Sequence, residues 1–151
     1  MRRWLRITIG ILCTVALAGL VALFFMQERQ VQLLKTDVLT IGTEKFSVEI
    51  VQTPALRARG LGGREELCEQ CGMLFLFDNA DLHAFWMKDM HFSLDIFWIQ
   101  DGVVVDSVQK ISPDDPRTFI PSTPAGMVVE FPGGTMERLH LRHGMTVFLE
   151  R

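Results

Sequence analysis

The chain has 151 residues, of which 48% are hydrophobic, and this is enough for one globular domain with a real core. Disorder is therefore excluded for most of the sequence. The formal net charge of −3 and the lack of a basic stripe argue against nucleic-acid binding, which requires clustered Lys and Arg side chains to neutralise phosphates.

The first segment in chain order is predicted to span a membrane. Ile7 to Met26 is a run of 20 residues without a charge. As an α-helix that rises about 1.5 Å per residue, it would cross the roughly 30 Å hydrocarbon core of a bilayer. Arg2, Arg3 and Arg6 precede this run, so the positive-inside rule predicts a single-pass protein of the cell membrane. Its N-terminus is then cytoplasmic and its C-terminal domain is extracytoplasmic.

Two other interpretations of this segment remain open. Ala16-Leu17-Ala18 supplies the small residues that a signal peptidase prefers, and Cys13 is a candidate lipid attachment site despite Leu12 before it. We favour an uncleaved anchor because a secretory apolar region is normally shorter than this one. All three interpretations export the domain. Beyond the first three arginines the chain has 12 basic and 18 acidic residues, a formal charge of −6. Such an acidic domain is not attracted to anionic lipid head groups, so it is expected to contact the membrane through the helix alone.

The next segments are predicted to be a stalk and a hairpin. Gln27–Thr36 is polar and holds no Gly or Pro, so the helix is expected to continue there. Residues 1–36 then form the anchor and stalk, and residues 37–151 form the exported β-rich domain. Val38–Ile41 leads into a turn at Gly42-Thr43, and Phe46–Ile50 alternates apolar and polar residues, which predicts a hairpin with one buried face.

Two short helices and about seven strands are predicted in all. Thr53-Pro54 is typical of a helix start and predicts a helix over Ala55–Leu61. Thr135-Met136-Glu137-Arg138 is expected to open a second helix of one or two turns that ends near Gly144. Ser112–Pro124 holds four prolines and is expected to be an irregular loop. Further strands are expected at Met73–Phe77, His83–Lys88, Leu94–Gln100, Val103–Val105 after an Asp101-Gly102 turn, Met127–Phe131 and Thr146–Leu149.

These elements predict an α+β, mostly β fold. We expect a compact barrel-like or sandwich-like sheet with two short helices, preceded by one transmembrane helix.

Cys68-Glu69-Gln70-Cys71 is the sharpest local motif. In an oxidising compartment the expected state is a disulfide between Cys68 and Cys71, which closes a small loop. A redox enzyme would need a poised thiolate, which Glu65, Glu66 and Glu69 oppose. A zinc site would need two further ligands, and His83 and His91 do not have zinc-finger spacing. No metal and no cofactor are therefore predicted.

Charged residues within apolar strands are the second feature. Lys88, Asp95 and Glu130 are each flanked by apolar residues, and a charge in such surroundings needs a partner or a wet cleft. They could form a pocket for a small polar ligand with Arg64 or Arg59 and with Trp86 as a stacking wall. They could equally pair with one another, as Lys88–Asp95 and as Glu130 with Arg64 or Arg59.

The biochemical activity is not predicted by any familiar enzyme motif. The leading hypothesis is a ligand- or partner-binding domain at the cell envelope. An enzyme alternative is a hydrolase that acts on a polar envelope component through Asp95 and Glu130 as general acid and base. A third alternative is a structural protein that docks to another envelope protein through an exposed apolar patch.

Several of these runs resemble a known bacterial and archaeal family, Domain of Unknown Function 192. The resemblance covers about residues 44–150 and rests on Arg59-Gly60-Leu61 through Arg64, Gly72-Met73-Leu74-Phe75 with Phe77, Phe85-Trp86-Met87-Lys88, Leu94-Asp95-Ile96, Gly102, Pro121, Glu130 and Gly134. The sequence departs from the usual pattern at Gly62, Ser93 and Met145. The resemblance implies a compact β-rich, barrel-like domain, often exported or membrane-tethered, and it implies no activity, because the family has no established one.

Overall fold

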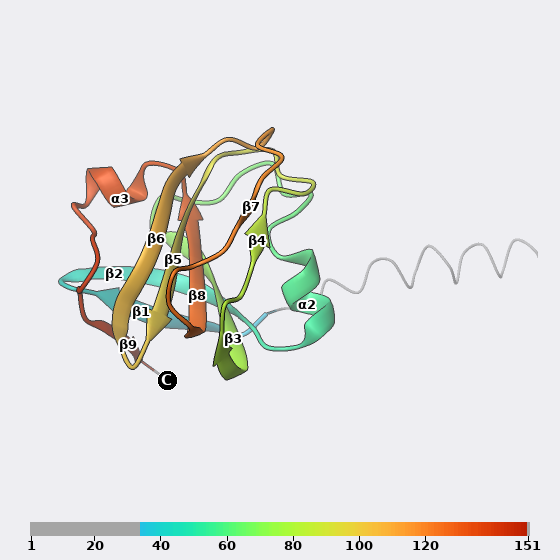
Figure 1. Cartoon of the computed structure of the whole chain (residues 1–151). Coiled ribbons are helices and arrows are strands. Elements are labelled where there is room, and N and C mark those ends of the chain that lie inside the picture. Colours follow the sequence, from blue (N-terminus) through green and yellow to red (C-terminus); the bar gives the residue numbers. More distant parts are fainter. Residues whose placement is uncertain (1–33, 151) are drawn as a thin grey trace, which may run out of the picture. The chain divides into compact units, whose positions relative to one another are not determined.

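The alternating strands of the sequence build a sheet that curls on itself. The computed structural model describes residues 34–150. Seven strands form a half-barrel in the order β6-β5-β8-β3-β2-β1-β9, and two short helices and a two-stranded sheet accompany it (Figure 1). The predicted mostly β fold with two short helices is thereby confirmed, with the sheet curled into half a barrel.

The predicted transmembrane span, Ile7–Met26, lies outside the described residues. Within residues 34–150, no helix is both long enough and apolar enough to cross a bilayer. The end of the predicted stalk does fall within this range, and there the prediction is wrong. Leu34 and Lys35 are not helical, and the Lys35 carbonyl accepts a hydrogen bond from the Ile50 N–H at 2.8 Å. Pairing with the sheet satisfies this backbone and so replaces a helix.

The first two strands form the predicted hairpin. β1 (Thr36–Ile41) and β2 (Glu44–Val51) pair antiparallel, with Leu39 opposite Phe46. Gly42 has a φ of 62°, which glycine adopts without steric penalty. Leu39 and Phe46 are both buried, so the alternation of the sequence gives the expected single buried face.

A helical crossover then joins two parallel strands. α2 (Pro54–Arg59) begins where predicted, because the Thr53 hydroxyl accepts a hydrogen bond from the Leu56 N–H at 3.3 Å. The helix ends at Arg59, two residues before the predicted end at Leu61, and Gly60 is its C-cap. β3 (Cys71–Asp81) runs parallel to β2, an arrangement that requires such a crossover, and it is longer than the predicted Met73–Phe77.

Three long strands form the other half of the sheet. β5 (Leu94–Gln100) has the predicted bounds and pairs with both β6 (Val103–Ile111) and β8 (Ala125–Pro132). The Asp101-Gly102 turn joins β5 to β6, with both residues at positive φ, as predicted.

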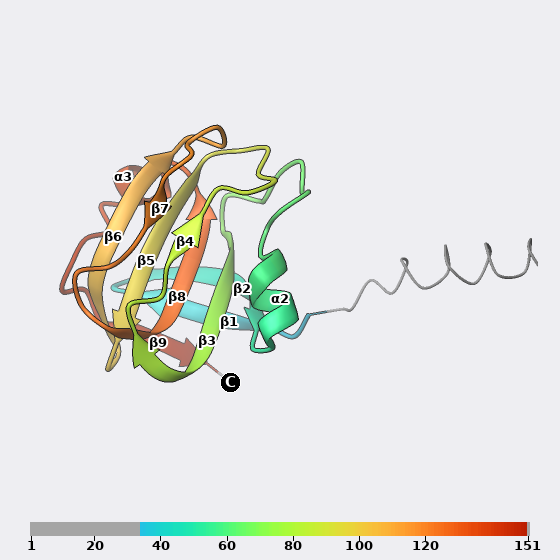
Figure 2. The same ribbon diagram turned by 45° about the vertical axis from the view of Figure 1, so that its right-hand side comes forward.

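The last strand lies at one edge of the sheet. β9 (Val147–Glu150) pairs antiparallel with β1, so the last strand of the domain lies beside the first one (Figure 2). At one end, the two edges of the sheet are also linked, because the Val147 N–H donates to the Gly102 carbonyl at 2.7 Å. The sheet is therefore partly closed.

Two predicted elements are wrong in their extent. The strand expected over His83–Lys88 is reduced to β4 (Phe85–Trp86), which pairs with β7 (Thr118–Phe119) inside the predicted loop. The helix from Thr135 is α3 (Thr135–Arg138), a single turn within the predicted length, but it ends well before Gly144, because the chain turns to a φ of 53° at His140.

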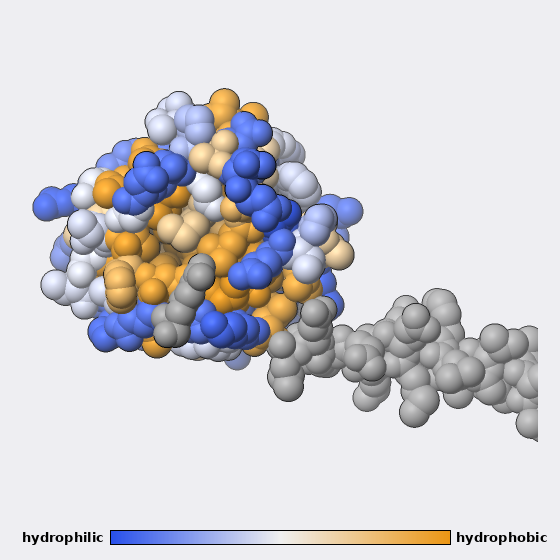
Figure 3. Space-filling view, turned by 90° about the horizontal axis from the view of Figure 1, so that it is seen from below, coloured by the Kyte–Doolittle hydropathy of each residue, from blue (hydrophilic) through white to orange (hydrophobic). Residues whose placement is uncertain are grey.

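The two faces of the sheet carry separate cores. Strands from both ends of the strand order contribute to one cluster, which fills the inside of the curl and includes Phe46, Phe97, Val129 and Phe131. The other cluster lies between the sheet and the segments that cover its outer face, and it includes Leu61, Met73, Phe75, Phe85, Ile96 and Trp98. Figure 3 looks into the end of the half-barrel where β9 ends, and apolar side chains gather in its hollow centre.

Candidate functional site

A cavity of about 200 Å³ opens on the outer face of the sheet. Its floor comes from β3 and β8, and its walls come from α2 with the glycine-rich loop after it and from the segment around β4. Of the predicted ligand-binding residues, it brings together Trp86, Lys88 and Glu130, with Arg59, the predicted alternative to Arg64. Arg64 and Asp95 are not among its lining residues.

Glu130 is the deep polar group of the cavity. It lies in the middle of β8, opposite Met73 of β3 and Ile96 of β5, so its side chain shares their face of the sheet. The residue is 5% exposed, and no side chain or backbone group of residues 34–150 forms a hydrogen bond with its carboxyl. Burial raises the pKa of Glu130 to about 8. At neutral pH this carboxyl is therefore mainly protonated.

The carboxyl oxygens of Glu130 face the cavity. Every side-chain polar atom that is fully enclosed in the described part of the chain has a hydrogen-bond partner. The Glu130 carboxyl has no such partner, so its oxygens are not among these enclosed atoms. Its oxygens must therefore keep some contact with open space, and the space that the residue lines is the cavity. An unpartnered buried polar group is uncommon in native proteins and calls for an explanation.

Aromatic side chains form much of the cavity wall. Phe75 and Phe85 pack edge to face with 4.9 Å between their ring centroids. The Phe77 ring stacks on the His83 ring, with 3.5 Å between their centroids. The Arg57 guanidinium lies over the Phe77 ring, 4.9 Å from its centroid. Trp86 is 50% exposed at the edge of the cavity.

Two exposed cations also line the cavity. Arg59 and Lys88 form no salt bridge with any residue of the 34–150 domain. Arg57 is different, because its guanidinium donates to the backbone carbonyls of Gln52 and Leu76, the latter at 2.7 Å. We call the exposed side chains of Arg59, Trp86 and Lys88 the rim.

A glycine contact fixes the position of Lys88. A Cβ on Gly62 would lie 3.1 Å from the Arg59 carbonyl and 3.4 Å from the Lys88 carbonyl, so the loop after α2 approaches the Lys88 backbone closely. The Gly63 N–H donates to the Asp89 carbonyl at 2.8 Å, and Asp89 has a φ of 57°. The glycine-rich loop, which lacks the features of a phosphate loop, thus holds one wall against the other.

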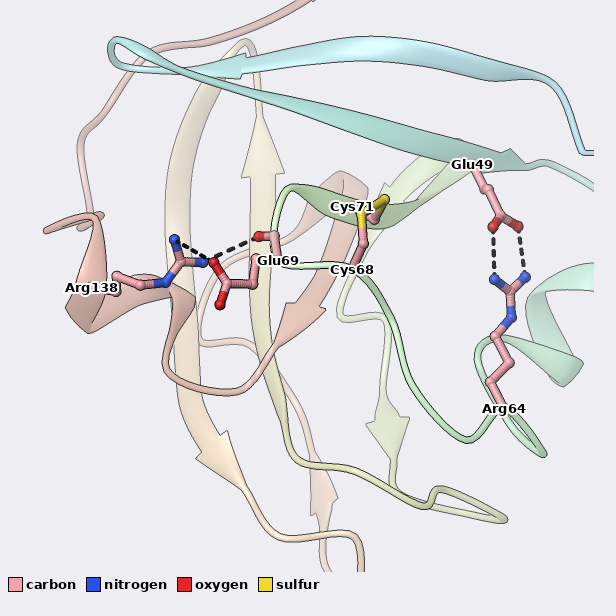
Figure 4. Close-up of a disulfide and its surroundings, with 6 residues drawn as sticks. All are labelled: Glu49, Arg64, Cys68, Glu69, Cys71 and Arg138. Carbon is pink, nitrogen blue, oxygen red and sulfur yellow. Dashed lines mark hydrogen bonds and ion pairs between the residues drawn. A yellow bond between two sulfur atoms is a disulfide. The ribbon is translucent and has the colours of Figure 1, made fainter.

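Arg64 pairs away from the cavity. It donates two hydrogen bonds to Glu49 of β2, at 2.7 and 2.6 Å, in a bidentate ion pair (Figure 4). The hydrogen bonds from Arg64 hold the pKa of Glu49 below its ordinary value, and those to Glu49 raise the pKa of Arg64. The predicted alternative in which Arg64 neutralises Glu130 is therefore wrong.

Asp95 lies on the opposite face of the sheet from Glu130. It is 0% exposed, and its carboxylate accepts three backbone N–H bonds, from Lys110 at 2.7 Å, Gly134 at 3.0 Å and Met136 at 2.7 Å. The predicted Lys88–Asp95 ion pair is not formed. Because Asp95 and Glu130 point in opposite directions, they do not share an open cleft, which the hydrolase hypothesis requires.

The predicted disulfide joins Cys68 and Cys71, whose Cα atoms are 5.0 Å apart. The Cys71 N–H also donates to the Cys68 carbonyl at 3.0 Å, which makes a tight turn directly before β3. Arg138 donates to the carbonyl of Glu69 at 3.2 Å, as Figure 4 shows. The motif is thus a staple at the entry to β3. Across residues 34–150, no group of three or more His, Cys, Asp or Glu side chains is placed to hold a metal ion.

The sequence did not indicate the Arg57–Phe77–His83 stack. Arg57 belongs to α2, Phe77 to the middle of β3 and His83 to the segment after β3, so no local spacing relates them. The one available signal was that Phe77 stands at the end of an apolar run, directly before Asp78-Asn79.

Comparisons with known proteins identify the domain. The family described as DUF192, Uncharacterized ACR, matches residues 37–149. The chain belongs to this family. A solved structure from Novosphingobium aromaticivorans DSM 12444, described as a protein of unknown function, is 30% identical with a TM-score of 0.75. The match covers 80% of this chain and 89% of that one.

A second solved structure has the same fold as this DUF192 domain. It comes from Sinorhizobium meliloti 1021 and is described as a candidate transcription regulator. It is 24% identical with a TM-score of 0.74, over 77% of this chain and 95% of that one. No curated protein matches the chain.

Proposed function

We propose that this DUF192 domain binds a small ligand with polar groups in the outer-face cavity, while a membrane anchor holds it outside the cytoplasm. The observation that carries the proposal is Glu130, a buried carboxyl that has no hydrogen-bond partner within residues 34–150 and faces an open space. Ligand pockets are typically apolar concavities with a few well-placed polar groups, and a raised pKa is common at such sites.

The residues behind the family resemblance support this choice of site. Four separate runs of the sequence carry much of that resemblance, and each contributes to the lining of the one cavity. They supply Arg59, Gly60 and Leu61, then Phe75 and Phe77, then Phe85, Trp86 and Lys88, and finally Glu130. A shared pocket explains why such distant segments would carry a common pattern.

Two observations support the extracytoplasmic location. The uncharged run Ile7–Met26 with arginines before it fits a single-pass anchor with a cytoplasmic N-terminus. The Cys68–Cys71 disulfide fits an oxidising compartment, because cytosolic proteins seldom keep structural disulfides. The location is tested with a reporter fused to the C-terminus. A reporter active only outside the cytoplasm is expected, and cytoplasmic activity would refute the anchor orientation.

The ligand-binding proposal is tested by thermal-shift measurements on the full chain in detergent against a library of envelope metabolites. We expect at least one compound to raise the unfolding temperature of the wild type and of Lys45→Ala, a surface variant far from the lining residues. The same compound should protect Lys88→Ala less. Equal protection of all three proteins would place binding elsewhere.

A further inference from the structure

We propose that the cavity takes a small organic anion, with its acidic group at the cationic rim and a hydrogen-bond acceptor at its inner end against Glu130. This inference rests on the proposed function and names the chemical class of the ligand. It follows from three properties of the cavity: the balance of charge along its lining, the protonation state of its deep carboxyl and the apolar wall between them.

The charge of the lining is opposite to that of the domain. Three cations, Arg57, Arg59 and Lys88, line the cavity, and Glu130 is the one acidic residue among its described lining residues. The chain beyond the first three arginines has a formal charge of −6. A local cationic cluster on an acidic domain attracts anions and opposes the entry of amines.

Arg59 and Lys88 are also free to bind an anion. Neither forms a salt bridge within the described domain, and both are exposed at the rim. The guanidinium and the ammonium are natural partners of carboxylate and phosphate groups. Arg57, in contrast, is held by two backbone carbonyls and by the Phe77 ring, so it adds positive potential without being available to move.

Glu130 is suited to donate a hydrogen bond to the inner end of the ligand. The groups that face it from the neighbouring strands are Met73 and Ile96, which are apolar, and the titratable groups around the cavity are Arg57, Arg59, His83 and Lys88. Because burial raises its pKa to about 8, the carboxyl keeps its proton at neutral pH. A protonated carboxyl has one O–H donor, which a carbonyl or ether oxygen of the ligand would accept.

The space between Glu130 and the rim selects an apolar body. Leu61, Phe75 and Phe85 are buried residues of the lining. A flat aryl group or a short alkyl chain would replace the water against these side chains and gain free energy from the area removed from solvent. The exposed Trp86 at the rim offers a further surface for stacking.

The inference is tested by calorimetric titration of the full chain in detergent at pH 7 with matched probes. 4-Acetylbenzoate carries an anion at one end of an aryl ring and an acceptor at the other. 4-Isopropylbenzoate lacks the acceptor, 4-acetylbenzamide lacks the charge, and 4-acetylbenzylamine reverses it. We expect 4-acetylbenzoate to bind at least about tenfold more tightly than each of the other three.

Two variants locate the probe and test the role of the proton. Lys88→Ala should weaken binding of 4-acetylbenzoate about tenfold, and Lys45→Ala should not change it. Glu130→Gln keeps an N–H donor at the same position, so it should bind the probe nearly as well as the wild type at pH 7. The wild type should lose affinity as the pH rises through about 8, while Glu130→Gln should not.

The outcomes separate this inference from the proposed function. Preferential binding of the benzylamine, or affinity that rises with pH and is lost in Glu130→Gln, would overturn the organic anion and leave a pocket that binds cations. Equal binding of the benzoate and the benzamide would overturn the role of the rim. If no probe of any charge binds and no metabolite protects the chain from unfolding, the pocket itself is refuted.

Discussion

The two buried carboxyl groups of this domain are close in the sheet and opposite in kind. Asp95 and Glu130 lie on the paired strands β5 and β8, one position apart in register, and face opposite sides. Asp95 accepts three backbone N–H bonds, from β6, from the residue before α3 and from α3 itself. Glu130 has no partner within residues 34–150 and faces a cavity.

The difference shows that burial alone does not separate a structural acid from a functional one. What separates them is whether the carboxyl oxygens already have hydrogen-bond partners in the described domain. The Asp95 carboxylate links β6 and α3 to one face of the sheet, and both of its oxygens accept hydrogen bonds from the backbone. The Glu130 carboxyl ties nothing in the described domain, so its unused donor and acceptor remain available to a ligand.

The largest effect is expected at Asp95. Asp95→Ala removes the acceptor for three backbone N–H groups and leaves them without a partner, so the free energy of unfolding should fall by about 4 kcal/mol. Urea unfolding at pH 7 measures this loss, with Asp114→Ala in the exposed loop as the control. A loss below about 1 kcal/mol would mean that water replaces the carboxylate and that the contrast with Glu130 is false.

A pH-dependent effect of similar size is expected at Glu130. The ordinary pKa of 4.5 applies in the unfolded chain, whereas the folded carboxyl has a pKa of about 8. Between these values the folded state holds a proton that the unfolded state has released, so stability falls as the pH rises and levels off above pH 8. Glu130→Gln has no such proton and should be more stable than the wild type by roughly 4 kcal/mol at pH 9.

This difference should vanish at pH 4, where Glu130 is neutral in both states. Urea unfolding of the wild type and Glu130→Gln at both pH values tests it, since other titrating groups cancel in the comparison. An equal stability difference at the two pH values would show that the folded carboxyl is not the group that titrates.

The next effect concerns the segment that leads from the cavity wall to β3. Reducing the Cys68–Cys71 disulfide, or replacing both cysteines with serine, should lower the free energy of unfolding by about 2 kcal/mol, because the closed loop is short. Thermal unfolding with and without reductant measures it, and the serine variant should not respond to reductant. No shift in the wild type would show that the turn is held by its backbone hydrogen bond alone.

The smallest effect is expected for the Arg64–Glu49 pair. Arg64→Ala should cost at most about 1 kcal/mol at pH 7, because both side chains are partly exposed and solvent screens the pair. The folded pKa of Glu49 is lowered, so this stabilisation is present above its ordinary pKa and is lost as the pH falls through the folded value. Wild type and variant should therefore converge as the pH falls below the folded pKa of Glu49, and a stability difference that persists in acid would refute the ion-pair explanation.

The elements that could be predicted from the sequence are those with a regular spacing of apolar residues or with typical turn or cap residues at their ends. The first hairpin, the bounds of β5, the Asp101-Gly102 turn and the start of α2 are set by residues close in the chain. The pairing of β4 with β7 was not predicted because each strand has only two residues, and β7 lies within the proline-rich segment. The parallel β2–β3 pair is likewise decided by tertiary contacts.

The candidate site was only partly predictable for the same reason. Lys88 and Glu130 were identified as charges in apolar strands, and the cavity brings them together with Trp86. Assigning Asp95 to the same site failed because strand alternation fixes the face of each residue only after the register is known. Asp95 pairs with Phe131 and Ile96 with Glu130, and no local pattern contains that register.

The pairing of β9 with β1 has a consequence for the newly made polypeptide. The strand completed last, Val147–Glu150, lies beside the strand made first, Thr36–Ile41. While the ribosome still holds residues 147–150, β1 keeps an unpaired edge and the inner apolar cluster lacks Val147. The nascent domain therefore stays incompletely folded until this strand leaves the ribosome, and until then the bare edge of β1 is open to aggregation.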